Sequence, residues 1–240
     1  MQLLLGAEPR TDILRRVQAA LIERFGRIVR PPDKRRSPEW TLVQGVIGAQ
    51  TRTAVSNRST DALLARYGTW ESVADASPEE LEPQLAAQSF PRVAAERLHA
   101  CLNAIRAERG AVDLRHLSNL TTEEAQAWLE TLPGVARKIS AQVMNTSTFA
   151  RRTMVIEGHH RRIMQRMGLV PEKADTLRCY ILLTPLFPAE WSAADMDEHH
   201  LLLKKLGQTA CRRSFLDCLH CPVWADCVTG RKRRAQVAPG

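Results

Sequence analysis

The sequence has no apolar run that approaches the roughly 20 residues needed to span a bilayer, so we expect no membrane segment and no membrane partner. Its start, MQLLLGAEPRTD, has no basic n-region and only a short apolar run, and it therefore predicts no signal peptide. A cytoplasmic location follows from these two absences. Thiols stay reduced in that compartment, so clustered cysteines there indicate a metal site rather than disulfides.

Patterns typical of β-strands are also missing. No stretch alternates apolar and polar residues with a period of two, and no Asn-Gly hairpin turn, repeat or low-complexity segment occurs. The pattern that is present is helical, as in TDILRRVQAALIERFG, where Ile13, Val17 and Leu21 share one face. With 240 residues, of which 44% are hydrophobic, the chain is long enough to bury a core. We predict an all-α fold of many short helices.

Capping residues locate several of these helices. We expect helix starts at the following caps: Ser37 before Pro38, Thr69, Ser77, and Thr121 with Glu124 in a capping box. Two glycines, Gly68 and Gly110, predict helix ends. Later helices are expected near residues 159–168, 172–184, 188–194 and 196–206. The RKRR run at 231–234 is interpreted as a frayed basic end.

The charge balance is strongly basic. The net charge is +8 and the sequence pI is about 9.6. A surface of this charge suits a polyanion such as nucleic acid. Simple solubility is the alternative explanation of the same charge.

Four of the six cysteines fall in one short stretch, CRRSFLDCLHCPVWADC. Cys211, Cys218, Cys221 and Cys227 have six, two and five residues between them. Four thiolates suit either a [4Fe–4S] cluster or a tetrahedral zinc ion. Zinc sites more often use two short cysteine pairs, so the spacing favours iron–sulfur and leaves zinc open. We expect the other two cysteines, at positions 101 and 179, to be ordinary buried thiols, and the histidine at 220 to face solvent.

A second motif, LETLPGVARKIS, indicates a helical hairpin. One helix should end near Leu132 and the next should begin at about Ala136, with Pro133 and Gly134 in the turn. Gly134 can take a positive φ, and N–H groups at a helix start can bind a phosphate oxygen without regard to sequence. A plain αα-hairpin would use the same Pro-Gly turn.

Together, LPGVARK and the C-x6-C-x2-C-x5-C spacing resemble the helix-hairpin-helix (HhH-GPD) DNA glycosylases, in particular the endonuclease III branch with its iron–sulfur loop. The resemblance covers about residues 35–227. It implies a six-helix barrel lobe at 30–150 with the hairpin at about 122–148, and an iron–sulfur lobe made of 1–29 and 151–240. It also implies a [4Fe–4S] cluster on the four clustered cysteines, and a nucleoid-associated monomer that binds double-stranded DNA with a damaged base or abasic site.

The resemblance further implies the catalytic pair. Lys138 matches the lysine that follows the hairpin in this branch. Such an amine can attack the sugar C1′ and form a Schiff base, and desolvation and the positive helix end would favour its neutral form. Without the resemblance, a phosphate-binding lysine would be the preferred interpretation. In VIEGHHRRI, Glu157 stands where the family has an aspartate, and its carboxylate would stabilise the cationic sugar-like transition state. The two groups should face each other across a cleft.

Glu157 departs from the family pattern by one methylene, and a misplacement of about 1 Å can cost roughly 100-fold in rate. Three outcomes are open. They are a working substitute with shifted geometry, a preference for easier leaving groups or pre-formed abasic sites, and a site that is silent in base excision. The neighbouring His159 matches a family histidine that is mainly structural.

DNA contacts are expected at two further places. The target base must leave the stack, and the resemblance implies that Gln50 and a wedge residue fill the gap. Phe90 occupies the place of the wedge, although a side chain simply buried between helices is the alternative. In the hairpin, the residues expected to contact DNA are Leu132, Gly134, Ala136 and Arg137.

The sequence therefore predicts a base-excision repair glycosylase, for an oxidised pyrimidine, with AP lyase activity through Lys138. One alternative is a glycosylase for a mismatched or alkylated base with little lyase activity. The other is a non-catalytic binder of damaged or abasic DNA.

Overall fold

The computed structural model describes residues 10–237 and divides the chain into two compact units. One unit, which we call the hairpin unit, is Pro32–Arg151. The other, the cysteine unit, takes the chain up to Pro31 and from Arg152 onward. The sequence predicted divisions after residues 29 and 150. The start of the chain, for which no signal peptide is predicted, lies mostly outside the described residues.

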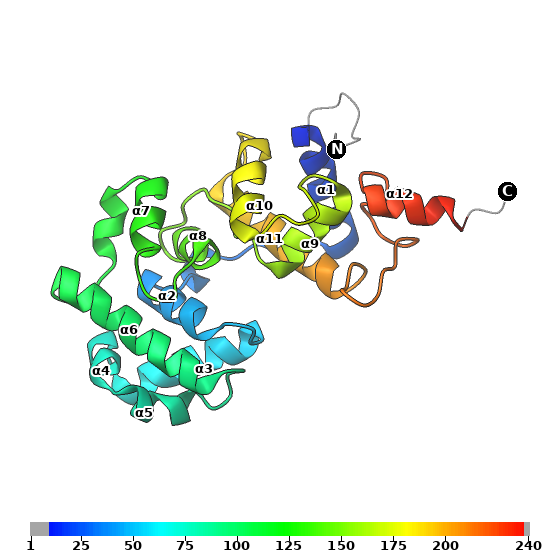
Figure 1. The fold of residues 1–240 in the computed structure, drawn as a ribbon. Coiled ribbons are helices and arrows are strands. Elements are labelled where there is room, and N and C mark those ends of the chain that lie inside the picture. Colours follow the sequence, from blue (N-terminus) through cyan, green and yellow to red (C-terminus); the bar gives the residue numbers. More distant parts are fainter. Residues whose placement is uncertain (1–9, 238–240) are drawn as a thin grey trace. The chain divides into compact units, whose positions relative to one another are not determined.

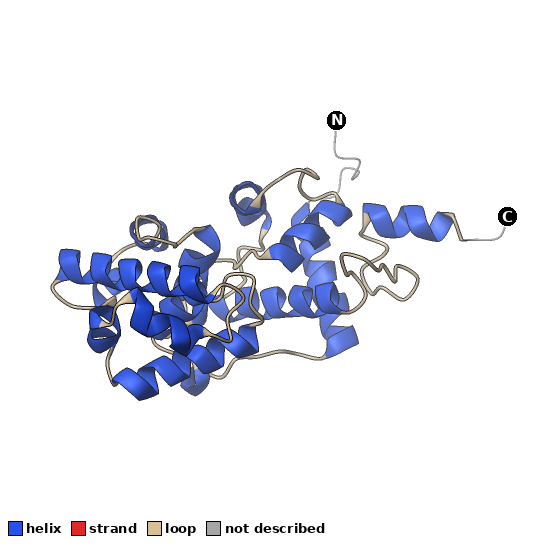
Figure 2. Ribbon diagram, turned by 60° about the horizontal axis from the view of Figure 1, so that its bottom comes forward, coloured by secondary structure: helices blue, strands red, loops and turns tan. Residues whose placement is uncertain are grey.

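The fold is all-α, as predicted. Figure 2 shows helices joined by loops, and the described residues contain no β-strand beyond one isolated bridge between Cys211 and Leu216. None of the helices in this part of the chain is long and apolar enough to cross a membrane.

Seven α-helices, labelled in Figure 1, make up the described hairpin unit: α2 (Pro38–Ile47), α3 (Thr53–Tyr67), α4 (Trp70–Asp75), α5 (Pro78–Leu81), α6 (Pro91–Arg109), α7 (Thr122–Leu129) and α8 (Arg137–Thr146). Helix α2 is buried along its whole length and packs against α8, α3 and α6. The approach to α8 is close, because a Cβ on Gly45 would lie 2.8 Å from Cγ2 of Ile139. Glycine at this position therefore lets the helix that follows the hairpin dock on the core.

The described cysteine unit contains α1 (Arg10–Phe25), α9 (Gly158–Met167), α10 (Thr176–Leu183), α11 (Ala193–Gln208) and α12 (Val228–Ala235). Helix α11 packs against α9 and α1, around an apolar core that includes Leu14, Met164 and Leu203. Burial of these side chains is the main stabilising contribution to the unit.

Charged side chains also tie α1 and the segment after it to α11. The buried carboxylate of Glu198 accepts hydrogen bonds from the backbone N–H of Ile28 at 2.9 Å and from Gln18 at 3.2 Å. Asp197, also buried, pairs with Arg30 at 2.8 Å. Each buried carboxylate thus has hydrogen-bonded partners, as burial of charge requires.

The predicted caps are confirmed. The side chains of Ser37, Thr69, Ser77 and Thr121 each accept a backbone N–H at a helix start, and the last two form capping boxes. Gly68 and Gly110 end α3 and α6 with positive φ.

Three expectations about helices are wrong. Residues 188–192 form a turn, in which Trp191 N–H donates to the carbonyl of Pro188, and α11 begins only after its cap at Ser192. Helix α10 begins at Thr176, four residues late, because Asp175 caps it. The basic run at 231–234 belongs to α12.

Helix α12 is held by tertiary contacts. The guanidinium of Arg234 lies 4.0 Å from the ring centroid of Trp224, and the side chain also donates to the carbonyl of Leu219. Thr229 donates to the carbonyl of Arg166 at 3.0 Å. These contacts hold the helix in place against the mutual repulsion of its basic side chains.

Candidate functional site

The LPGVARK segment forms a tight turn between two helices of the hairpin unit. Gly134 has φ +79°, the left-handed conformation that the sequence predicted for it. Leu132 and Val135 are buried, and Val135 N–H donates to the carbonyl of Leu132 at 3.1 Å. Ala136 is the N-cap of α8 and provides no side-chain cap. The start of α8 is thus capped by no side chain of its own, and the first N–H groups of a helix lack intrahelical acceptors.

Lys138 lies in the first turn of α8 and is half-buried. Helix α8, which carries Lys138, is fixed by burial of its other side chains. Ser140, Ala141 and Val143 are all buried. A lysine one turn from a helix start is within the positive end of the helix dipole.

Arg137, the predicted DNA contact beside it, is engaged within the unit. Its Nε lies 2.7 Å from Oε1 of Glu130, and both side chains are 24% exposed. Ser140 donates to the same carboxylate oxygen at 2.5 Å. Sequence analysis missed this pair because the turn, and not helical periodicity, brings Glu130 beside α8.

The position of Glu157 is fixed by the residues on either side of it. The preceding residues, Met154, Val155 and Ile156, are all buried. Glu157 then serves as the N-cap of α9, where its Oε1 accepts the N–H of His159 at 3.3 Å. The carboxylate is partly exposed. The longer glutamate side chain therefore still performs the capping role that aspartate fills more often.

A basic pocket surrounds Glu157 within the cysteine unit. Its lining includes Arg162, Arg212 and Arg213 beside His159 and Gly207. Arg162 is fixed, because its Nη2 donates to the carbonyls of Gly207 at 2.9 Å and Cys211 at 3.0 Å. Burial lowers the pKa of Arg162 from its ordinary value. The carboxylate thus stands among guanidinium groups that can bind an anion such as a phosphate.

The two histidines after Glu157 are both structural in their contacts. His159 lies within 2.9 Å of Arg162 through Nδ1, and it packs so tightly on Gly207 that a Cβ there would lie 2.5 Å from the same nitrogen. His160 is fully buried, and burial lowers its pKa to about 4. His160 therefore has no exposed surface, and its ring packs edge-on against Phe187.

Gln50 and Phe90 lie on two loops of the hairpin unit that hydrogen bonds join. Both side chains are exposed, and Phe90 is 49% exposed. The alternative that Phe90 is buried between helices is therefore wrong. Gln50 has φ +54°, which is uncommon for a residue other than glycine. The Oγ of Ser89 donates to the carbonyl of Gln50 at 3.0 Å.

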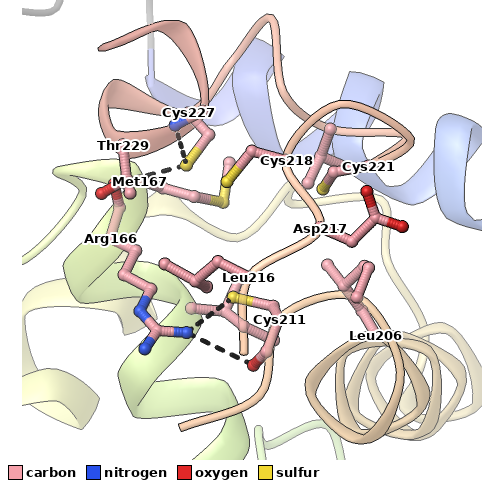
Figure 3. Close-up of a pocket in the computed structure, with 14 residues that line it drawn as sticks. Arg166, Met167, Leu206, Cys211, Leu216, Asp217, Cys218, Cys221, Cys227 and Thr229 are labelled. Carbon is pink, nitrogen blue, oxygen red and sulfur yellow. Dashed lines mark hydrogen bonds between the residues drawn. The ribbon is translucent and has the colours of Figure 1, made fainter. Parts of the chain in front are cut away.

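The four clustered cysteines line one pocket of the cysteine unit, shown in Figure 3. Its apolar wall includes Ile163, Met167, Leu206 and Val223. The cysteines are Cys211, Cys218, Cys221 and Cys227.

Two of these sulfurs accept hydrogen bonds. Arg166 donates to Sγ of Cys211 at 3.1 Å, and the backbone N–H of Gly230 donates to Sγ of Cys227 at 3.4 Å. Burial raises the pKa of Cys221 to about 11 and also raises that of Cys227. Deprotonation of such buried thiols needs a compensating positive charge, which a metal provides.

In the described part of the chain, no three Cys, His, Asp or Glu side chains lie close enough together to hold a metal ion. The chemistry of the four thiols is nevertheless that of a metal centre. Four thiols around one apolar pocket, two of them with N–H donors, are the surroundings that tune iron–sulfur clusters.

The remaining predictions about cysteine and histidine are confirmed. Cys101 and Cys179 are buried in the two cores and lie outside the cysteine pocket. His220 is exposed and lies 2.8 Å from Asp217.

Solved structures of DNA glycosylases share this fold. An endonuclease III in non-covalent complex with DNA has a TM-score of 0.75 and 22% identity, and the match covers 94% of this chain and 98% of that chain. A thermostable thymine-DNA glycosylase has a TM-score of 0.72 and 16% identity, with 93% and 97% covered.

Relatives found by sequence include proteins of the same kinds. Endonuclease III of Synechocystis is 29% identical over 153 residues, which cover 63% of this chain and 65% of that protein. DNA glycosylase/AP lyase ROS1 of Arabidopsis thaliana is 20% identical over 229 residues, or 90% of this chain but 16% of ROS1. The chain spans less than two thirds of the length of these curated relatives.

The family model of the HhH-GPD superfamily base excision DNA repair proteins matches residues 43–185, which is more than half of the chain. The match includes the hairpin turn, Lys138 and Glu157. The chain belongs to the HhH-GPD superfamily of base excision DNA repair proteins.

Proposed function

We propose that this protein is a DNA glycosylase that removes a damaged base, in particular an oxidised pyrimidine, and then cleaves the strand as an AP lyase. The observation that carries the proposal is Lys138, half-buried in the first turn of α8 directly after the Gly134 turn. Family membership supports the glycosylase, and the lysine supports the lyase step.

In the proposed reaction, Lys138 acts as the nucleophile. Its neutral Nζ attacks C1′ of the flipped nucleotide, the C1′–N bond breaks, and the electron pair leaves with the base, which takes up a proton. Loss of the amine proton and opening of the sugar give a Schiff base. Removal of a C2′ proton then expels the 3′ phosphate and cleaves the strand.

Glu157 supplies negative charge during this reaction. Positive charge develops on the sugar as the base leaves, and a carboxylate stabilises it. Glu157 is anchored by its cap to α9, so its charge is held in place before substrate binds. Lys138 belongs to the hairpin unit and Glu157 to the cysteine unit, and the proposal requires both to reach the same nucleotide.

Damaged or abasic double-stranded DNA is the proposed partner. Backbone N–H groups at the turn, around Leu132, Gly134 and Ala136, would bind one phosphate. Arg137 would add charge there only by sharing or leaving Glu130. Gln50 and Phe90 would enter the duplex when the nucleotide leaves the stack.

A [4Fe–4S] cluster is the proposed cofactor, with one thiolate from each of the four cysteines of the pocket. Such a cluster supplies structural cross-links between segments of the loop. The chain's own part is to exclude water with the apolar wall, and to donate N–H groups from Arg166 and Gly230 to two of the sulfurs. Zinc is the alternative that elemental analysis distinguishes.

A second candidate is a glycosylase for a mismatched or alkylated base with little lyase activity. The additional methylene of Glu157 favours it, because displacement of the carboxylate changes which leaving groups depart. A non-catalytic binder of damaged or abasic DNA is the third candidate.

Borohydride trapping separates these candidates. Abasic and thymine-glycol duplexes are incubated with the holoprotein, and the Schiff base is reduced to a stable adduct. We expect an adduct and strand cleavage with the wild type, and neither with Lys138→Gln. Lys173→Gln, which changes an exposed lysine, is the matched control and should behave as the wild type.

Other outcomes favour the other candidates. Excision of the base without any adduct would support a glycosylase that lacks the lyase step. DNA binding with neither excision nor adduct would leave only the non-catalytic binder.

A further inference from the structure

Two exposed loops of the hairpin unit are joined by a set of hydroxyl hydrogen bonds. One loop lies between α2 and α3 and carries Gln50, and the other precedes α6 and carries Phe90. The N–H of Ser89 donates to Oγ1 of Thr51 at 2.9 Å, and Oγ of Ser89 donates to the carbonyl of Gln50 at 3.0 Å. The hydroxyl of Thr51 in turn lies 3.2 Å from Oγ of Ser89.

The donors and acceptors of this set are mutually consistent. Ser89 uses its single hydroxyl proton on the Gln50 carbonyl, so its oxygen can still accept from Thr51. The one hydroxyl proton of Thr51 has two acceptors at 3.2 Å, Oγ of Ser89 and the carbonyl of Ala49. Thr51 also accepts the Ser89 N–H. We call these two residues the hydroxyl clip.

The clip stands on a rigid base. Gln88 is buried, and its Nε2 donates to Oγ of Ser59 in α3 at 2.8 Å. The N–H of Thr51 donates to the carbonyl of Gly48 at 3.2 Å, which closes the turn that holds Gln50 at φ +54°. Behind that turn, a Cβ on Gly48 would lie 2.7 Å from a backbone oxygen of α2.

Flexible exposed loops are poor wedges, because their freedom must be lost when they enter a base stack. Here the clip fixes the backbone of Gln50 to the residue directly before Phe90. The backbone positions from which the aromatic ring and the amide project are thus bonded to each other.

We propose that Thr51 and Ser89 are positioning residues that make Gln50 and Phe90 one preformed duplex-opening element. This inference rests on the proposed binding of duplex DNA. It assigns no contact with DNA to either hydroxyl, since both act through the residues beside them.

The test measures duplex opening independently of chemistry. The holoprotein is mixed in stopped flow with a thymine-glycol duplex that carries 2-aminopurine beside the lesion, and the fluorescence rise reports unstacking. The variants are Ser89→Ala, Thr51→Val, the double variant, and Ser89→Thr, which keeps the hydroxyl. Ser118→Ala removes an exposed serine hydroxyl of the same unit that bonds only locally, to the carbonyl of Arg115, and is the matched control.

We expect the opening rate constant to fall about tenfold in the double variant, in keeping with the rate cost of small misplacements, while the affinity for DNA changes less than about twofold. Ser89→Thr should restore most of the rate, and Ser118→Ala should match the wild type. Melting curves identify any variant that fails to fold, in which case Ser89→Ala alone decides.

Opening at the wild-type rate in the double variant would overturn the proposal, as would a wild type that binds the duplex without unstacking it. An equal loss in Ser118→Ala would do the same. Normal opening without excision or adduct would instead contradict the proposed function and leave the clip in place.

Discussion

The hairpin unit and the cysteine unit bury different polar groups. Among the described residues, the buried polar side chains of the hairpin unit are uncharged Ser, Thr, Asn and Gln. The cysteine unit buries two carboxylates and three histidines: Asp197, Glu198, His160, His199 and His200. The hairpin unit therefore depends mainly on apolar packing, whereas the cysteine unit also depends on protonation and on its thiol pocket. Changes of pH, loss of metal and changes of packing should therefore affect the stability of the two units differently.

Removal of one pocket cysteine should produce the largest difference in stability between the two units. Cys221→Ser replaces a thiol of the pocket, and we expect loss of bound iron and unfolding of the cysteine unit at lower denaturant, because metal binding contributes to folding free energy. Iron and sulfide analysis with limited proteolysis measures both effects. Cys179→Ser, a buried thiol of the same unit outside the pocket, should retain its iron. Equal iron in both variants would contradict the assignment.

Removal of the Glu157 charge should separate catalysis from binding. We expect Glu157→Gln to lower the single-turnover rate of base excision at least about 100-fold, since it removes charge stabilisation of the transition state. DNA affinity should be unchanged or higher, because a negative charge leaves a basic pocket. Glu172→Gln, an exposed residue of the same unit, is the control. Normal excision by Glu157→Gln would mean that another carboxylate does this work.

Acid should destabilise the cysteine unit through its buried histidines. The pKa of His160 is about 4 in the folded protein against an ordinary 6.5, and burial is the main cause. Between these values the unfolded chain binds more protons, so stability is present above about pH 6.5 and is lost as the pH falls toward 4. At pH 5 we expect a loss of about 2 kcal/mol from this group relative to pH 7.

Denaturant unfolding at both pH values measures this loss. His160→Gln should remove most of the contribution, whereas His220→Gln, which changes an exposed histidine, should keep it. The direction for His199 is the same, because burial lowers its pKa as well. A wild type equally stable at pH 5 and pH 7 would contradict the comparison of the two units.

The smallest expected effect is a change of packing in the hairpin unit. Gly45→Ala places a Cβ 2.8 Å from Ile139, and overpacking should cost about 1–3 kcal/mol of unfolding free energy. Gly158→Ala meets no atom within 4 Å and should be neutral or slightly stabilising. Thermal melting compares the two, and equal melting temperatures would show that α2 and α8 can move apart without cost.

Local sequence patterns predicted what depends on neighbouring residues. The predicted caps at Ser37 and Thr121 and the positive φ of Gly134 are confirmed. Each of them depends on only a few adjacent residues, which is why the sequence could predict it. The helix at 228–235 was missed, because contacts between Arg234 and Trp224 stabilise it.

The candidate site shows the same limit. The resemblance pointed to Glu157 in the place of an aspartate, and the structure shows that this side chain caps α9 through the N–H of His159. The ion pair between Arg137 and Glu130, and the guanidinium groups around Glu157, were not predicted because tertiary folding brings them together. The sequence shows which functional groups the chain carries, and the tertiary fold determines which of them come into contact.

The proposed lyase reaction requires a covalent bond between Lys138 and the sugar. Mass spectrometry of the borohydride-trapped adduct, after digestion of protein and DNA, locates the modified residue directly. We expect the sugar remnant on the peptide that contains Lys138, and on no other lysine. An adduct on another lysine or on the N-terminal amine, or excision of the base with no adduct at all, would contradict the proposed role of Lys138.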